Sequence, residues 1–335
     1  MRHTDVTLDD KFLLSEGRVF ITGVQALLRV LMDQRRLDER AGLNTAGFLS
    51  GYRGSPLGGL DQQAHRAQKF LDQAQVVFKE GLNEDLAATA VWGSQQANLF
   101  PGARYDGVYG MWYGKAPGVD RTGDAFKHAN FAGTWPKGGV LAVAGDDHAC
   151  KSSTLPSQSE YAFQDFEIPV LSPADVQEVL DFGLIGYGMS RYSGLWVGLI
   201  ALADTMDSGA TIDVSLDRHG LVLPANHALP SGGLGIRLKD QPLDKERRLR
   251  TQKIPAALAY ARANRIDRVM LAPARPRLGI VCQGQAYKDV VEAFAAMRIS
   301  LQEAADLGVA IYKVGMPWPL EPTGLKAFAA GLETL

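Results

Sequence analysis

Residues 139–145 read GVLAVAG, a run of small and branched apolar residues, and two aspartates, Asp146 and Asp147, follow it directly. Apolar runs of this length, without polar alternation, are typical of strands buried on both faces of a parallel sheet. In α/β proteins, ligands bind beyond the carboxyl ends of such strands. This stretch therefore predicts an α/β fold, and it predicts chemistry in the residues that follow the strand.

The same pattern recurs along the first two hundred residues. Strands are predicted at 45–50, 76–79, 107–111, 169–171 and 195–203. Helices are predicted between them, at 20–36, 57–71, 83–99 and 173–189. Ser172 is expected to cap the last of these helices, with Pro173 at its first position. Short apolar strands that alternate with helices indicate a doubly wound parallel sheet.

A length of 335 residues predicts two domains. We expect the first domain to span 1–204. An interdomain connection, rich in proline, glycine and charge, is expected over 205–276. The start of a second, smaller α/β domain is expected over 277–335, with strands at 278–283 and 309–314. Because only two strand–helix units follow residue 277, we expect the chain to be part of a longer protein.

Composition excludes several classes of protein. The net charge of −2 gives no electrostatic reason to expect binding to nucleic acid or to a membrane surface. The polar N-terminus lacks the apolar core of a signal peptide, and the apolar run at 195–203 is far shorter than the roughly 20 residues of a membrane span. Two cysteines, Cys150 and Cys282, can neither form a disulfide framework nor hold an iron–sulfur cluster. We expect a cytoplasmic protein.

Four loops rich in glycine and polar residues follow the predicted strands, at 51–59, 80–88, 112–124 and 146–158. The carboxyl ends of parallel strands share one edge of the sheet, so these loops predict a binding site there. Glycine is also common in ordinary turns. The prediction therefore rests on the shared position of the four loops at one edge of the sheet, not on a sequence motif. The loops contain no dinucleotide fingerprint, phosphate-binding loop or nucleophile elbow.

Glu84 opens the helix predicted at 83–99 and has two interpretations. A carboxylate in the first turn of a helix complements the helix dipole, which is its ordinary role. The functional interpretation is a buried carboxylate that forms a hydrogen bond with a protonatable ring nitrogen. The sequence alone leaves both open.

Other charged residues in the loops are candidates for substrate or metal contacts. Lys115 and Arg121 fit a surface turn as well as they fit a substrate role. Asp146, Asp147 and His148 suggest a metal site, but Lys151 stands beside them. A mixed Asp/His set next to a lysine is a poor set of ligands, so no metal is expected.

Four segments, in order, resemble the 2-oxoacid:ferredoxin oxidoreductase family, specifically its indolepyruvate type in the fused bacterial form. They are Tyr52-Arg53-Gly54-Ser55-Pro56, Asn83-Glu84-Asp85-Leu86-Ala87, GMWYGKAPGVDRTGD at 110–124, and the set Gly138-Gly139, Asp146-Asp147, Ser152-Ser153 and Gln158. The segments 168–182, 278–290 and 311–322 are also typical of that family. The resemblance covers nearly the whole chain and identifies an N-terminal portion of such an enzyme.

The resemblance implies a Pyr-type domain that binds the aminopyrimidine of thiamine diphosphate (ThDP), followed by a domain similar to the C-terminal domain of transketolase. Glu84 matches the family's glutamate, which bonds the aminopyrimidine N1′ and so promotes loss of the proton from thiazolium C2. Gly54, Ser55 and Pro56 are implied to contact the cofactor. Ser55, Lys115, Arg121 and Asp147 are implied to lie near an anionic 2-oxo acid. The implied reaction is oxidative decarboxylation of an arylpyruvate such as indolepyruvate to acyl-CoA, with electrons passed to ferredoxin.

Two departures from the family pattern leave the substrate open: Arg53-Gly54 replaces a proline–glycine pair, and Ser55 replaces threonine. No G-D-G…N-N motif for Mg²⁺ and diphosphate is present. We therefore expect a PP-type module and iron–sulfur modules elsewhere to bind Mg²⁺ and the clusters, with coenzyme A and ferredoxin as further partners in a homo-oligomer. Two alternatives stay open: a non-catalytic dimerisation or assembly module derived from a ThDP enzyme, and a ThDP enzyme of another class.

Overall fold

A computed structural model describes residues 6–151, 155–218 and 220–335. Its main feature is a six-stranded sheet with the order β3-β2-β4-β5-β7-β6, in which every neighbouring pair is parallel. The strands are β2 (Thr45–Gly51), β3 (Val76–Phe78), β4 (Gly107–Lys115), β5 (Val140–Asp146), β6 (Val170–Leu171) and β7 (Trp196–Leu202). This arrangement confirms the predicted α/β fold class.

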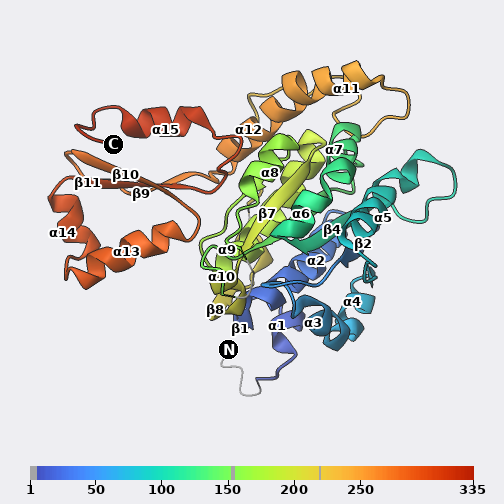
Figure 1. Cartoon of the computed structure of the whole chain (residues 1–335), viewed down its shortest axis with the longest axis horizontal. Helices are drawn as coiled ribbons and strands as arrows, with labels where there is room; N and C mark the ends of the chain where they lie inside the picture. Colours follow the sequence, from blue (N-terminus) through green and yellow to red (C-terminus); the bar gives the residue numbers. More distant parts are fainter. Residues whose placement is uncertain (1–5, 152–154, 219) are drawn as a thin grey trace.

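Helices cover both faces of this sheet (Figure 1). One face carries α2 (Gly23–Arg40), α3 (Leu60–Arg66), α4 (Gln68–Gln73) and α9 (Val176–Ser193). The other carries α5 (Glu84–Gln96), α6 (Ala116–Arg121), α7 (Gly123–Ala132) and α8 (Glu160–Asp165). Alternate strand residues point into the two cores: Leu141 and Val143 face the first, whereas Ala142 faces the second.

A short ribbon and a connecting region complete the first part of the chain. β1 (Arg18–Thr22) pairs antiparallel with β8 (Gly209–Asp213), after the short α1 (Asp10–Leu13) and α10 (Ala203–Asp207). The connection to the second sheet contains α11 (Pro242–Arg248), the π-helical turn η3 (Leu249–Lys253) and α12 (Ile254–Ala263). Within the described residues, no helix is long and apolar enough to cross a membrane.

The second, smaller sheet has three strands in the order β10-β11-β9. β10 (Leu278–Gln283) and β11 (Val309–Val314) are parallel, and β9 (Arg268–Leu271) joins them antiparallel. α13 (Ala286–Ala296) and α14 (Leu301–Asp306) lie on one face, and α15 (Pro322–Ala329) lies on the other (Figure 1). Ile311 therefore packs in the α13–α14 core, and the next residue, Tyr312, stacks on Phe328 of α15.

Several predicted details differ from the structure. The helix predicted at 20–36 begins at Gly23, because Thr22 and Gln25 form a capping box there and 18–22 is a strand. The helix expected to start at Pro173 begins at Val176, with Asp175 rather than Ser172 as its cap. The strand β9 lies in the segment 205–276, which was expected to be an interdomain connection without strands. The division into 1–204, 205–276 and 277–335 remains a proposal.

Main-chain hydrogen bonds join the second sheet to the edge of the first. The Val170 amide of β6 donates to the Trp318 carbonyl (2.7 Å), and the Ser172 amide donates to the Gly315 carbonyl (2.8 Å). Side chains reinforce this junction: Glu178 of α9 accepts from Arg268 (2.6 Å) and from the buried Lys313 of β11. The two sheets are therefore held in a defined arrangement.

Candidate functional site at the carboxyl edge of the sheet

Glu84 is the first residue of α5, directly after the loop that follows β3. The side chain of Asn83 caps this helix by accepting from the Leu86 amide (2.9 Å), so the helix start is fixed. The indole of Trp112 in β4 donates to the Glu84 carbonyl (3.1 Å) and ties the helix to the sheet. Glu84 is only 6% exposed. The carboxylate therefore does not have the solvated position that an ordinary first-turn glutamate would have.

The Glu84 side chain lies against Gly118 of α6. A Cβ atom added to Gly118 would lie 2.5 Å from Glu84 Cγ and 2.8 Å from Oε1. Among the described residues, none donates a hydrogen bond to the Glu84 carboxylate, although this side chain is buried. A buried carboxyl group is costly unless it is hydrogen-bonded, so this group suits a donor supplied by a ligand.

The loop after β2 folds over the neighbouring strands. The Tyr52 amide donates to the Tyr113 carbonyl (3.0 Å), and the Ser55–Pro56 peptide is cis. Gly54 sits on the stem of Lys115, since an added Cβ would lie 2.7 Å from the Lys115 Cδ. Pro56 covers β5, where a Cβ on Gly145 would lie 2.8 Å from Pro56 Cδ. Gly54, Pro56 and Lys115 are thus brought together at the carboxyl edge of the sheet, with Ser55 between the first two.

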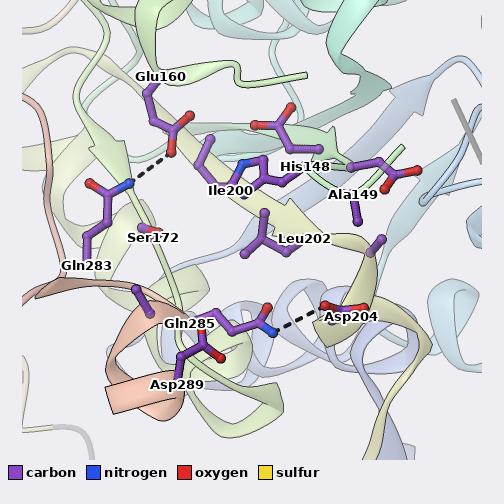
Figure 2. Close-up of a pocket in the computed structure, with 14 residues that line it drawn as sticks. His148, Ala149, Glu160, Ser172, Ile200, Leu202, Asp204, Gln283, Gln285 and Asp289 are labelled. Carbon is purple, nitrogen blue, oxygen red and sulfur yellow. Dashed lines mark hydrogen bonds between the residues drawn. The ribbon is translucent and has the colours of Figure 1, made fainter. Parts of the chain in front are cut away.

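A cavity of about 280 Å³ opens at the ends of β5 and β7, between the two sheets (Figure 2). The larger sheet and its loops contribute Asp146, Asp147, His148, Glu160 and Asp204, among others. The smaller sheet and its first helix contribute Gln283, Gln285, Ala286 and Asp289. Of the predicted site residues, Asp147 lines this cavity, whereas Glu84, Ser55, Lys115 and Arg121 do not.

Polar contacts hold the wall formed by Asp146 and Asp147. Asp146 is fully buried and accepts from the Ser159 amide (2.8 Å) and hydroxyl (2.6 Å). Burial raises the pKa of Asp146 to about 7, against the lowering effect of these two hydrogen bonds. Asp147 accepts from the Lys151 amide (3.1 Å). The Lys151 ammonium forms an ion pair with Asp204.

Arg121 lies on the surface, 55% exposed, where its guanidinium pairs with Asp85 (3.1 Å). The structure therefore does not place it in a cleft with the cavity residues. Ser152 and Ser153, part of the resemblance, lie outside the described residues. Sequence reasoning missed Gly118, because the segment 112–124 was interpreted as one loop. In the structure, β4 continues to Lys115 and two helices follow.

Glu160 and the glutamines of the second sheet were also missed. Glu160 begins a short helix, and the first turn of a helix is an ordinary place for a glutamate. Gln283 and Gln285 reach the cavity only because the second sheet docks beside β6. No local sequence signal reports that docking.

Comparisons with known proteins agree with this architecture. Residues 268–335 match the family model described as the indolepyruvate oxidoreductase domain. The chain is 22% identical over 328 residues to an indolepyruvate oxidoreductase subunit IorA from Methanothermobacter marburgensis, covering 97% of this chain and 47% of that protein. It is 25% identical over 338 residues to an IorA subunit from Pyrococcus abyssi, covering 98% and 46%.

Among solved structures, the chain is similar to a 2-oxoglutarate:ferredoxin oxidoreductase from Magnetococcus marinus with 2-oxoglutarate, coenzyme A and succinyl-CoA bound. The TM-score is 0.64 at 15% identity, covering 95% of this chain and 57% of that one. These comparisons confirm the resemblance and the fold. The chain spans about half the length of the curated relatives it matches.

Proposed function

We propose that this chain is the aminopyrimidine-binding part of a ThDP-dependent 2-oxoacid:ferredoxin oxidoreductase. The proposed reaction is oxidative decarboxylation of an arylpyruvate, such as indolepyruvate, to acyl-CoA with electrons passed to ferredoxin. PP-type and iron–sulfur modules would supply the Mg²⁺–diphosphate site and the clusters. The observation that carries this proposal is the buried Glu84 carboxylate, which lies at the carboxyl edge of a parallel sheet and lacks a donor among the described residues.

The residues around Glu84 fit an aminopyrimidine. Gly118 leaves no side chain between α6 and the carboxylate, and Trp112 and Asn83 fix the backbone that carries it. A carboxyl group held in this way can share a proton with a ring nitrogen, which a solvated one does less effectively. ThDP, when bound, would supply the carbon nucleophile for decarboxylation. The chain's own contribution is to position the ring and to hold the proton between Glu84 and that nitrogen.

The loop after β2 and the end of β4 carry the residues that we propose to contact the substrate. Lys115 is partly exposed, and none of the described carboxylates pairs with it, so its ammonium is available to an anionic 2-oxo acid. Gly54 lies directly on the Lys115 stem, and Ser55 and Pro56 follow it in the same loop. Asp147 lies in the neighbouring cavity and would contribute there.

The test compares two adjacent carboxylates in the enzyme assembled with its PP and iron–sulfur modules. Glu84→Gln is expected to remove nearly all arylpyruvate-dependent dye reduction while leaving the far-UV circular dichroism unchanged. Asp85→Asn is the matched control, because Asp85 stands on the same helical turn but pairs with Arg121 at the surface. Activity that survives Glu84→Gln, or an equal loss in both variants, refutes the assignment.

A second candidate function has its own supporting observation. Large apolar side chains are exposed close to Glu84 in the sequence: Leu82 is 85% exposed and Leu86 is 52% exposed. Such surfaces are typical of protein interfaces, so the chain could serve as a non-catalytic dimerisation or assembly module. Calorimetry on the enzyme assembled with its PP-type module decides between the two, since Mg²⁺-dependent ThDP binding that Glu84→Gln weakens contradicts a purely structural module.

A further inference from the structure

Asp146, His148 and Glu160 form a cluster at the cavity between the two sheets. Each offers one ligand atom, and these atoms all lie within 4.8 Å of one another. They come from three segments: the end of β5, the loop after it and the start of α8. Figure 2 shows His148 and Glu160 among the side chains that line this cavity.

The two carboxylate oxygens of Glu160 differ, because one accepts a hydrogen bond from a side chain and the other does not. Oε1 accepts from the Gln283 amide of the second sheet (3.2 Å), as Figure 2 shows. Oε2 is buried and has no hydrogen-bond partner among the described residues. A buried carboxylate oxygen without a partner is unfavourable, and this one lies in the cluster with Asp146 and His148. This oxygen is therefore available to coordinate a cation.

The other two residues can also coordinate. Each Asp146 oxygen accepts one hydrogen bond from Ser159 and keeps a second lone pair. These bonds also fix the orientation of the carboxylate, as the outer hydrogen bonds of metal ligands do. The His148 imidazole is exposed at the rim of the cavity, so a ring nitrogen can turn towards the ion without loss of packing.

The charge around the cluster is negative. Five carboxyl groups line the cavity, from Asp146, Asp147, Glu160, Asp204 and Asp289. Lys151 does not neutralise the cluster, because its ammonium pairs with Asp204. The neighbouring lysine was the reason for expecting no metal at Asp146, Asp147 and His148. In the structure that lysine is committed elsewhere, and Glu160 takes the third position.

We propose that Asp146, His148 and Glu160 bind one divalent transition-metal ion, of the Zn²⁺ or Mn²⁺ class. Two carboxylates and an imidazole are ligands that such ions accept, and the cavity has room for water at the remaining positions. Because Gln283 of the second sheet holds Glu160, the ion would also bind the two sheets together. The proposal is independent of Glu84, which does not line this cavity.

The experiment uses the full 335-residue chain after treatment with a chelator. Calorimetric titration with Zn²⁺, and electron paramagnetic resonance with Mn²⁺, are expected to show one site per chain. Glu160→Gln and His148→Ala should each weaken binding by more than the roughly 10–100-fold that loss of an outer contact costs. Both positions are partly or fully exposed, so these variants are expected to fold, which circular dichroism would verify.

The matched control is Asp289→Asn, which removes a carboxylate that lines the same cavity but is not in the cluster. Unchanged affinity in this variant, together with losses in the other two, supports the site. The proposal is overturned if neither ion binds stoichiometrically. It is also overturned if the control weakens binding as much as Glu160→Gln does, since the acidic cavity would then only attract cations diffusely.

Discussion

Replacing Lys253 by methionine should both stabilise the protein and change how its stability depends on pH. Lys253 ends the π-helical turn η3, and its side chain is fully buried. Its ammonium donates to the Gly194 carbonyl (3.2 Å). Burial, with a further contribution from the positive charge of Arg248, lowers the pKa of Lys253 from 10.5 to about 7.

The size and sign of the effect follow from this pKa. A fall from 10.5 to about 7 corresponds to about 5 kcal/mol of unfavourable free energy when the lysine is charged, which we take as an upper bound. Below about pH 7 the group is protonated in both states, so the full cost applies. Between about pH 7 and 10.5 only the unfolded chain binds the proton, so stability rises with pH. Between pH 7 and 9 this gain is about 2 kcal/mol.

Urea unfolding of the wild type and of Lys253→Met at pH 7 and pH 9 measures this gain. Other groups titrate equally in both proteins, so the difference between the two pH dependences isolates Lys253. Lys239→Met is the control, since Lys239 is exposed in the segment that precedes α11. If wild type and Lys253→Met show the same change from pH 7 to 9, Lys253 is not held in an environment that depresses its pKa.

Three further changes test the structure elsewhere. Glu178→Gln leaves the buried Lys313 without its counter-ion and should destabilise the junction of the two sheets by about 3–5 kcal/mol. The measurement is amide hydrogen exchange in β11, which should become faster. Unchanged exchange would contradict this expectation. Gly118→Ala should displace the Glu84 side chain, because the added Cβ would overlap it. Calorimetry of the assembled enzyme should then show no ThDP binding, with the secondary structure retained. Normal binding would argue against the proposed contact. Asn83→Ala should cost about 1 kcal/mol in urea unfolding, and no loss would show that the cap is unimportant.

The central sheet was predictable because its strands are buried on both faces. The runs at 45–50, 139–145 and 195–203 became β2, β5 and β7, since near-continuous apolar runs of this length are typical of strands buried on both faces of a parallel sheet. The β1–β8 ribbon was not predicted. Phe20 in β1 is 68% exposed, and the segment merges into the helical pattern of α2, so local periodicity gave no separate signal.

The site was predictable where a single segment carries the information. Glu84 was expected at the start of a helix, and α5 begins at this residue, with Asn83 as its cap. The contact between Glu84 and Gly118 joins loops that follow different strands, so it exists only after the sheet has formed. Arg121 illustrates the opposite case: its charge suggested a substrate contact, but its position on α6 directs it to Asp85 at the surface.

The junction at β6 has a consequence for any attempt to divide this protein. β6 is the last strand of the six-stranded sheet, and its Val170 amide donates to the Trp318 carbonyl in the segment that follows β11. A recombinant version that stops before residue 268 would leave the outer edge of β6 unpaired, although its pairing with β7 would remain. Open strand edges promote intermolecular pairing. Such a truncation should therefore precipitate more readily than the whole chain.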